Sequence, residues 1–317
     1  MVQQPETTAA PAFKSIHVIL NPASGQATPV LAQLNTGLQN SGMDWEILIT
    51  KKAGDAKRFA EKAVKEGVEV VAAFGGDGTV MEVASGLMGS KVPLAILPGG
   101  TANVMSSELN IPRELPDAIA LVAEGLGALR WVDIGQVRDQ LFLLRLGIGL
   151  EAEAILNADR EDKNRMGRFA YVLSGLQALR EPKVATYQVT IDGKEFEAQG
   201  VTAFIANSGN IGVPGVSMAP NMSVSDGLLD LLVVRSADLG SLVNIVVNAA
   251  RPDVLAEPLQ HWQGREIKLV ADMPQMVEMD GEEIEAPPLV AKIIPKAVRV
   301  IVPMMPEGTQ AAASAAT

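Results

Sequence analysis

The chain of 317 residues contains no cysteine, which excludes disulfide bonds and every reaction that needs a thiolate. It also lacks a secretory signal pattern and any apolar run of the roughly 20 residues that a membrane-spanning helix requires. These absences argue against a disulfide-stapled secreted domain and against an integral membrane protein with helical spans. We therefore expect a cytoplasmic protein without a transmembrane segment, which can still lie peripheral to a membrane.

Basic residues and histidine are scarce as well. The chain has 26 Lys and Arg against 37 Asp and Glu, a net charge of −11. This balance argues against nucleic acid as the main partner and against nonspecific adhesion to anionic membranes. The two histidines give no catalytic signal, because His17 lies inside an apolar strand pattern and we expect His261 in a surface loop. The composition, 48% hydrophobic and 20% charged, suits two globular domains.

A glycine-rich turn at 75–79, Gly-Gly-Asp-Gly-Thr, joins a strand-like run to a helical pattern. Such a turn presents backbone N–H groups and the positive end of a helix to an anion. Asp77 is unfavourable beside bare phosphate and becomes favourable when a divalent cation lies between them. The turn predicts a nucleotide-using phosphotransferase, with Thr79 as the helix N-cap. A plain strand-to-helix connection is the alternative for this motif taken alone.

Two further turns rich in small residues follow strand-like runs. Asn-Pro-Ala-Ser-Gly at 21–25 comes after the run at 15–20, and Pro-Gly-Gly-Thr-Ala-Asn at 98–103 comes after the run at 92–97. In open α/β sheets, ligands collect beyond the carboxyl ends of the strands. We therefore expect all three turns to converge on one nucleotide.

Strand-like and helical runs alternate in the first 133 residues, an order typical of a parallel sheet with helices on both faces. Strand candidates then follow one another closely, which predicts a β-rich second domain. The expected strands lie at 15–20, 45–50, 68–74, 92–97, 141–147, 185–192, 195–206, 228–235, 265–271, 275–279 and 289–294. The expected helices lie at 28–41, 54–66, 79–88 and 115–125, with further helical patterns at 151–180 and 238–250.

An ordered series of short motifs extends over almost the whole chain. The series is Asn-Pro-x-Ser-Gly at 21–25, Thr50 with Gly-Asp-Ala at 54–56, Gly-Gly-Asp-Gly-Thr at 75–79 with Glu82, Pro-x-Gly-Thr-x-Asn at 98–103, Val-Asp-Ile-Gly at 132–135, Asp-Gly-x-Leu-Asp at 226–230 and Asp-Gly-Glu at 280–282. In this order the motifs resemble the bacterial diacylglycerol kinase-like and sphingosine kinase-like lipid kinases. The resemblance implies an α/β N-terminal domain similar to that of NAD kinases and phosphofructokinases, and a β-sandwich-like C-terminal domain.

The resemblance also implies domain limits. The nucleotide-binding diacylglycerol kinase catalytic domain would cover 13–133 and a returning strand near 298–305, and the lipid-substrate domain would cover 134–297. Residues 1–12 and 306–317 show no hydrophobic period, and we expect both to be disordered tails.

The activity implied is transfer of the γ-phosphate of ATP to a hydroxyl of diacylglycerol, a sphingoid base, ceramide or a related lipid. Asp77 and Asp133 would join a metal and water network around the triphosphate, while Glu282 would accept the proton of the lipid hydroxyl. The implied ATP-binding positions are Asn21, Ser24, Gly25, Thr50, Gly75, Gly76, Asp77, Gly78, Thr79, Glu82, Gly100 and Thr101.

A structural Mg²⁺ is also implied. Its ligands would be the Asp226 side chain and the backbone carbonyls of Ser223 and Leu228, a set of oxygen donors that fits a hard cation.

Two positions depart from the family pattern. Gln26 stands where members often carry a basic residue, and Val104 stands where they commonly carry Asp. The lost charges keep open the alternative of a nucleotide-binding regulator without transfer activity. A NAD kinase-like enzyme is a second alternative, because NAD kinases share the Gly-Gly-Asp-Gly-Thr turn. The lipid, which we expect at the membrane surface, is not identified by these residues. The oligomeric state is also open, with a homodimer among the alternatives.

Overall fold

The computed structural model describes residues 7–24, 29–149, 184–210, 215–236, 255–257, 259–285 and 288–304. The helices expected at 151–180 and 238–250 lie outside these residues, as do Gly25, Gln26 and the C-terminal tail. Among the helices of the described ranges, none is long and apolar enough to cross a membrane.

The first part of the chain forms alternating strands and helices, as predicted from its periodicity. Its elements are β2 (Ser15–Leu20), α1 (Val30–Gln39), β3 (Asp44–Ile49), α2 (Asp55–Glu66), β4 (Val70–Gly75), α3 (Asp77–Leu87), β5 (Leu94–Pro98), α4 (Val104–Glu108) and α5 (Leu115–Ala123). Strands β3, β2, β4 and β5 pair in this order, all in parallel. All six residues of β4 are buried, which explains its continuous apolar sequence.

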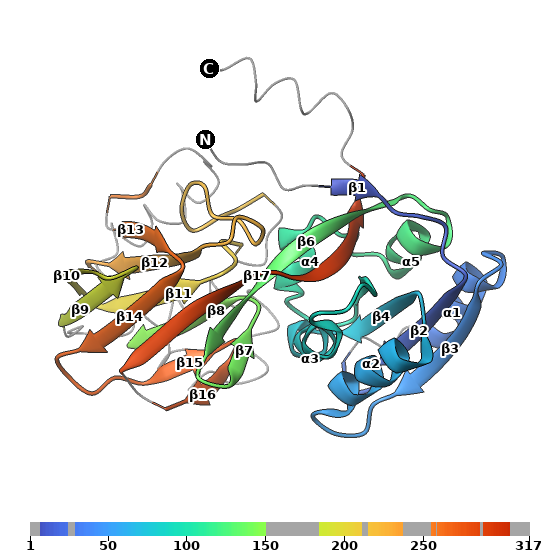
Figure 1. Ribbon diagram of the computed structural model, residues 1–317, viewed down its shortest axis with the longest axis horizontal. Helices are drawn as coiled ribbons and strands as arrows, with labels where there is room; N and C mark the ends of the chain where they lie inside the picture. The colour runs from blue at the N-terminus through green and yellow to red at the C-terminus, as the bar shows by residue number, and fades with distance from the viewer. Residues whose placement is uncertain are drawn as a thin grey trace, which may run out of the picture.

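Helices cover both faces of this parallel sheet. The chain moves toward one edge from β2 to β3 and toward the other edge from β3 through β4 to β5. Because parallel crossovers are right-handed, α1 lies on the face opposite α2 and α3. Helix α2 packs on α3, and α1 packs on α5. The four turns at the carboxyl ends of the strands therefore open at one rim of the sheet (Figure 1).

The second part of the chain is a β-sandwich, as expected. One sheet has the order β13-β12-β11-β8-β15-β16, and an apolar cluster separates it from the β10-β9-β14-β17 end of the larger sheet. The strands are β7 (Gln140–Phe142), β8 (Arg145–Gly149), β9 (Ala185–Ile191), β10 (Lys194–Gly200), β11 (Thr202–Ala206), β12 (Leu229–Val234), β13 (Leu259–Gly264), β14 (Glu266–Ala271), β15 (Val277–Met279) and β16 (Glu282–Ile284).

Two long strands connect the parts. β6 (Gly127–Val137) and β17 (Leu289–Pro303) are antiparallel over almost their whole length, and they run from the α/β domain into the sandwich (Figure 1). The last residues of β17 also pair in parallel with β5, so the end of the chain returns to the first domain. A bulge between Ile294 and Val298 shifts the register of β17, and Lys296 has a φ of 50° there.

Several expectations need correction. Within the expected N-terminal tail, β1 (Thr7–Ala9) pairs with β6, which supplies the backbone partners that a tail lacks. The runs at 141–147 and 195–206 are each two strands, and 289–294 belongs to the same strand as the returning end. His261 lies in β13, not in a loop, where its Nε2 contacts the Asp230 carboxylate at 2.6 Å. Trp262 packs on Phe196, and this contact favours a strand despite the polar sequence of β13.

Candidate active site

The glycine turn at 75–79 lies between β4 and α3. Gly76 is the N-cap position, with φ −87° and ψ −175°, and α3 begins at Asp77. The prediction that Thr79 caps the helix is therefore wrong: Thr79 is already inside the first turn, and its buried hydroxyl accepts a hydrogen bond from Asn21 Nδ2 at 3.1 Å. A Cβ on Gly75 would lie 2.4 Å from Thr79 Oγ1, so the close approach of this hydroxyl requires glycine.

The three predicted turns meet. Asn21 connects the first turn to Thr79, and the N–H groups of Gly99 and Gly100 donate to Gly75 O at 2.9 and 3.2 Å. A Cβ on Gly100 would lie 2.6 Å from Gly76 Cα, so the second and third turns touch through their backbones. These contacts form one surface of small residues at the N-terminus of α3. Within the first turn, Ser24 Oγ donates to Asn21 O at 2.8 Å, and Thr101 is exposed in the third.

Asp77 joins the second turn to α4. Its Oδ2 accepts the Val104 N–H at 3.1 Å, and its Oδ1 accepts the Met105 N–H at 3.0 Å. These two donors belong to the first turn of α4 and have no partner within that helix. Asp77 thus has a structural role that its sequence motif does not reveal. Each carboxylate oxygen has a second lone pair, so these bonds leave acceptor capacity for a further ligand.

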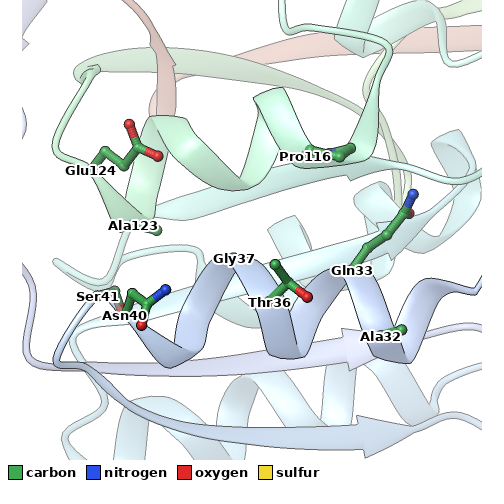
Figure 2. Close-up of a pocket in the computed structure, with 9 residues that line it drawn as sticks. All are labelled: Ala32, Gln33, Thr36, Gly37, Asn40, Ser41, Pro116, Ala123 and Glu124. Atoms are coloured by element: carbon green, nitrogen blue, oxygen red, sulfur yellow. The ribbon is translucent and has the colours of Figure 1, made fainter.

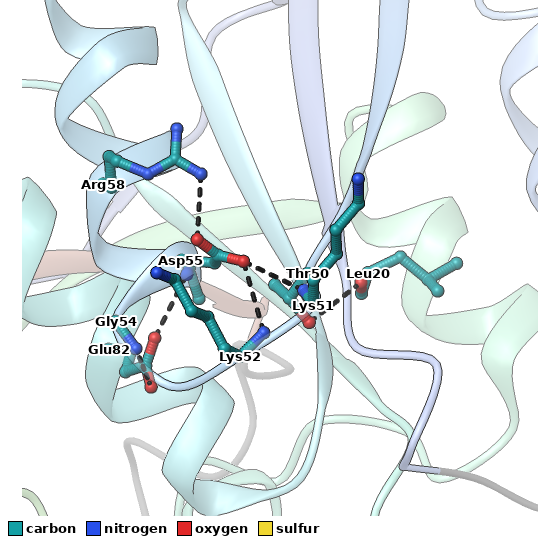
Figure 3. A network of polar contacts seen from close by, with 9 residues as sticks. Leu20, Thr50, Lys51, Lys52, Gly54, Asp55, Arg58 and Glu82 are labelled. Atoms are coloured by element: carbon teal, nitrogen blue, oxygen red, sulfur yellow. Dashed lines mark hydrogen bonds and ion pairs between the residues drawn. The ribbon is translucent and has the colours of Figure 1, made fainter.

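Glu82 and Thr50 support the rim in a different way from that predicted. Glu82 points at the N-terminus of α2, where its Oε1 accepts the Gly54 N–H at 2.9 Å and its Oε2 accepts the Ala56 N–H at 3.1 Å (Figure 3). Thr50 is buried and donates to Leu20 O at 3.4 Å. Both side chains therefore hold the backbone of the rim.

Asp55 secures the same rim from inside α2. It is 5% exposed, and one of its oxygens accepts the N–H groups of Lys51 and Lys52 (Figure 3). The Arg58 guanidinium bonds the other oxygen at 2.9 Å and, with the two backbone bonds, lowers the pKa of Asp55. The motif Gly-Asp-Ala at 54–56 therefore has a structural role: it begins α2, and its Asp55 side chain fixes the loop that follows β3.

Asp133 is 1% exposed and lies where the two domains join. Its two oxygens accept the N–H groups of Gly227 and Lys296, both at 2.7 Å, and its own N–H donates to Val224 O. Burial raises the pKa of Asp133, and the two N–H donors oppose that change. The side chain thus fixes the loop at 223–228 to β6 and to the bulge of β17.

The loop at 223–228 carries the predicted magnesium ligands. Asp226 Oδ1 accepts the Leu228 N–H at 3.0 Å, and Ser223 Oγ accepts the Ser225 N–H at 3.2 Å. Burial, together with the nearby Asp230 and Asp133 carboxylates, raises the pKa of Asp226 to about 6. A cation would stabilise the ionised form in this surrounding, so the residues fit an oxygen-bound Mg²⁺. Within the described ranges, no three acidic or His side chains form a metal cluster, and the predicted set needs only one.

Glu282 is exposed at the start of β16, directly after the turn at Asp280. Asp280 holds this turn against the sandwich, because it accepts the N–H groups of Leu143, Leu144 and Arg145 at 2.8 to 3.1 Å. Burial raises the pKa of Asp280 to about 6, and these donors oppose the rise. The Asp-Gly-Glu motif therefore combines a half-buried carboxylate that anchors the turn with an exposed carboxylate two residues later.

Sequence reasoning missed Glu108. It is the last residue of α4, and its Oε2 accepts the Ser208 hydroxyl at 2.8 Å and the Asn210 N–H at 3.1 Å. Burial raises its pKa, while the Ser208 bond and the nearby Arg130 charge lower it. Partners about 100 residues away in the sequence leave no local signal. The pair of Asp230 and His261 was missed for the same reason.

A pocket of about 420 Å³ lies between α1 and α5, apart from the predicted site residues (Figure 2). It is lined by Ala32, Gln33, Thr36, Gly37, Asn40, Ser41, Pro116, Ala123 and Glu124. Its lining mixes apolar and polar side chains, and none of these residues belongs to the three turns.

Comparisons with known proteins agree with the arrangement of the motifs. Residues 15–137 match the model of the diacylglycerol kinase catalytic domain, and residues 145–302 match the YegS C-terminal NAD kinase beta sandwich-like domain. The chain belongs to the diacylglycerol kinase-like family of lipid kinases. This assignment confirms the predicted fold and the predicted class of enzyme, an ATP-dependent lipid kinase.

Individual relatives resemble this lipid kinase along most of their length. A diacylglycerol kinase of Bacillus subtilis is 28% identical over 276 residues, which are 85% of this chain and 90% of the relative. An uncharacterized protein of Synechocystis is 31% identical over 308 residues, or 92% of this chain and 71% of the relative. The crystal structure of a diacylglycerol kinase from Bacillus anthracis has a TM-score of 0.79 at 28% identity and covers 92% of this chain and 98% of its own.

Proposed function

We propose that this lipid kinase transfers the γ-phosphate of ATP to a hydroxyl of diacylglycerol, with a sphingoid base or ceramide as alternative acceptors. The observation that carries the proposal is the contact of the three turns, in which Asn21 bonds Thr79 and Gly100 touches Gly76. Together they give a surface without bulky side chains at the N-terminus of α3, where backbone N–H groups favour phosphate. The acceptor is taken from the names of its relatives.

In this proposal the nucleotide lies along the rim of the parallel sheet. Exposed Gly78 and Thr101 would contact phosphates directly, whereas Thr50 and Glu82 would act through the backbone that they hold. Asp77 would contact the divalent cation that the nucleotide phosphates bind, and it would keep its hydrogen bonds to α4. Ser24 shapes the first turn; Gly25, which we predict beside the phosphates, lies outside the described residues.

Magnesium would serve in two places. At the nucleotide it would neutralise charge on the phosphate oxygens when bound, with Asp77 as the nearest proposed ligand. At the loop it would be held by Asp226 with the carbonyl oxygens of Ser223 and Leu228. Asp133 orients this loop through the Gly227 N–H. We therefore propose a positioning role for Asp133 beside its expected place in the metal and water network.

In the chemical step, we propose that Glu282 acts as the general base. Its carboxylate takes the proton of the lipid hydroxyl, the hydroxyl oxygen forms a bond to the γ-phosphorus, and the bond from that phosphorus to the bridging oxygen of ADP breaks. The products are a phosphorylated lipid, ADP and one proton held on Glu282 that solvent then removes. Exposure of Glu282 is compatible with both the entry of a lipid and the loss of this proton.

The acceptor is tested with radiolabelled ATP and Mg²⁺ against mixed micelles that contain diacylglycerol, sphingosine or ceramide, and against NAD in solution. We expect label in diacylglycerol above all. Label in NAD alone would favour a NAD kinase-like enzyme, and nucleotide binding without any transfer would favour the regulator.

Two substitutions test the assigned roles. Asp77→Asn should abolish transfer, and Glu282→Gln should lower kcat about 100-fold with nucleotide binding retained, as expected for loss of a general base. Glu283→Gln is the matched control, because Glu283 is the exposed neighbour of Glu282 in β16. A Glu282→Gln variant that loses ATP affinity instead would refute the base assignment.

We also propose that the protein meets its lipid at the membrane surface. Flotation with liposomes of phosphatidylcholine, with and without diacylglycerol, tests this. Binding that needs diacylglycerol supports recognition of the lipid at the surface, and transfer to short-chain diacylglycerol in solution without flotation argues against it.

A further inference from the structure

Helix α4 has a carboxylate at each end, both from the first domain: Asp77 of α3 bonds its start, and its own last residue, Glu108, bonds the sandwich. At its start, Asp77 accepts the Val104 and Met105 N–H groups. At its end, Glu108 accepts the Ser208 hydroxyl and the Asn210 N–H from the sandwich. The first four residues of α4 are buried, so this one-turn helix is packed on its sides as well. A displacement of its first turn is therefore expected to reach Glu108.

The sandwich continues the connection from Ser208. The N–H groups of Asn207 and Ser208 both donate to Leu144 O at 2.8 and 3.1 Å, and the Asn207 side chain donates to Leu143 O at 2.9 Å. Leu143 and Leu144 in turn donate their N–H groups to Asp280. The segment at 207–210, which Glu108 bonds, is thus hydrogen-bonded to residues 143–144. The same residues anchor Asp280, in the turn before Glu282.

Electrostatics favour a defined position for Glu108. The half-buried carboxylate has two donors and lies near the Arg130 guanidinium, whose Nε donates to Ser225 Oγ at 2.9 Å. A carboxylate that is partly removed from water favours such partners, because loss of a donor leaves desolvation uncompensated. The contact is therefore expected to be two-state, made or broken, and such a contact can transmit a displacement.

We propose that Glu108 is a positioning residue that couples the glycine turn at 75–79 to the turn at 280–282. By holding Ser208 and Asn210 against α4, it sets the separation between the glycine turn at 75–79 and the turn that carries Glu282. The kinetic part of this inference rests on the proposed function, while the coupling itself does not. Spatial continuity alone does not establish coupling, so the test must perturb one end and read the other.

The ligand-free test is amide hydrogen exchange in four proteins: wild type, Asp77→Asn, Glu108→Ala and the double variant. Asp77→Asn should speed exchange in α4, at 207–210 and at 280–284. In the Glu108→Ala background, Asp77→Asn should speed exchange in α4 alone. Glu124→Gln, an exposed carboxylate at the end of α5, should leave every segment as in wild type. An unchanged 280–284 segment in Asp77→Asn, or an undiminished response in the double variant, overturns the proposal.

The kinetic test separates positioning from stability. Glu108→Ala should lower kcat about 10- to 100-fold through misplacement of the reacting groups, with KM for ATP nearly unchanged. Ser208→Ala should lower kcat by less, and the double variant should be no worse than Glu108→Ala, since both changes break one link. Additive losses, or a normal kcat in Glu108→Ala, overturn the proposal. If Glu108→Ala does not fold, Ser208→Ala replaces it in both experiments. If the wild type transfers no phosphate, the proposed function fails, and the exchange data still decide the coupling.

Discussion

The change Glu82→Ala distinguishes a nucleotide ligand from a structural cap. Glu82 accepts the Gly54 and Ala56 N–H groups, and α2 has no side-chain cap of its own because Gly54 is its N-cap residue. Loss of one capping hydrogen bond lowers the free energy of unfolding by about 1 kcal/mol. Loss of both bonds at this partly exposed site therefore lowers it by about 2 kcal/mol. With an unfolding entropy of about 2.1 cal/mol/K per residue over 317 residues, that loss lowers Tm by about 3 °C.

The assay is thermal unfolding by circular dichroism without nucleotide, with Glu61→Ala as the control. Glu61 is exposed in α2, and alanine is a good helix former, so its Tm should hardly change. Binding of a fluorescent ATP analogue is measured on the same proteins well below Tm, where we expect Glu82→Ala to bind as wild type does. If Glu82→Ala has the Tm of the control and binds ATP weakly, Glu82 is not a cap for α2. That result would favour direct contact between Glu82 and ATP, as the motif predicts.

Two other predictions concern pH and the glycine turns. Because the folded pKa of Asp226, about 6, is above the ordinary aspartate pKa of 3.8, its stabilising contribution is complete below pH 3.8 and is lost as the pH rises through 6. In the presence of a chelator, the wild-type Tm should fall between about pH 4 and 6, and Asp226→Asn should flatten this fall. A parallel curve for the variant would contradict this. Gly100→Ala should lower the unfolding free energy by about 1 to 3 kcal/mol in urea, because its Cβ meets Gly76 Cα at 2.6 Å. Gly78→Ala, which meets nothing within 4 Å, should keep its stability and weaken ATP binding.

The parallel half of the fold was predictable because its strands are buried on both faces and its helices are amphipathic. The six apolar residues of β4 and the spacing in α3 place both elements within two residues of their observed limits. In the sandwich, where β13 has the sequence Leu-Gln-His-Trp-Gln-Gly, polar side chains find partners on distant strands. His261 needs Asp230, which is 31 residues away. No local pattern carries that information.

The candidate site shows the same division. The three turns and their meeting were predictable from strand ends alone, because parallel strands deliver their turns to one rim. The tasks of single side chains were not. Asp77 and Asp133 both accept backbone N–H groups from segments 27 to 163 residues away, so their structural roles depend on tertiary contacts. A motif records which residue is present and leaves its partners unspecified.

The position of β17 has a consequence for biosynthesis. Its final residues lie between β5 and β6, so the sheet of the first domain is incomplete until the last part of the chain has been made. A ribosome that has released residues 1–137 has therefore produced two unpaired strand edges, which invite pairing with other chains. Expression of the first domain alone would create the same edges permanently. A circular permutant that places 288–304 ahead of β2 would supply the missing strand at the start of synthesis.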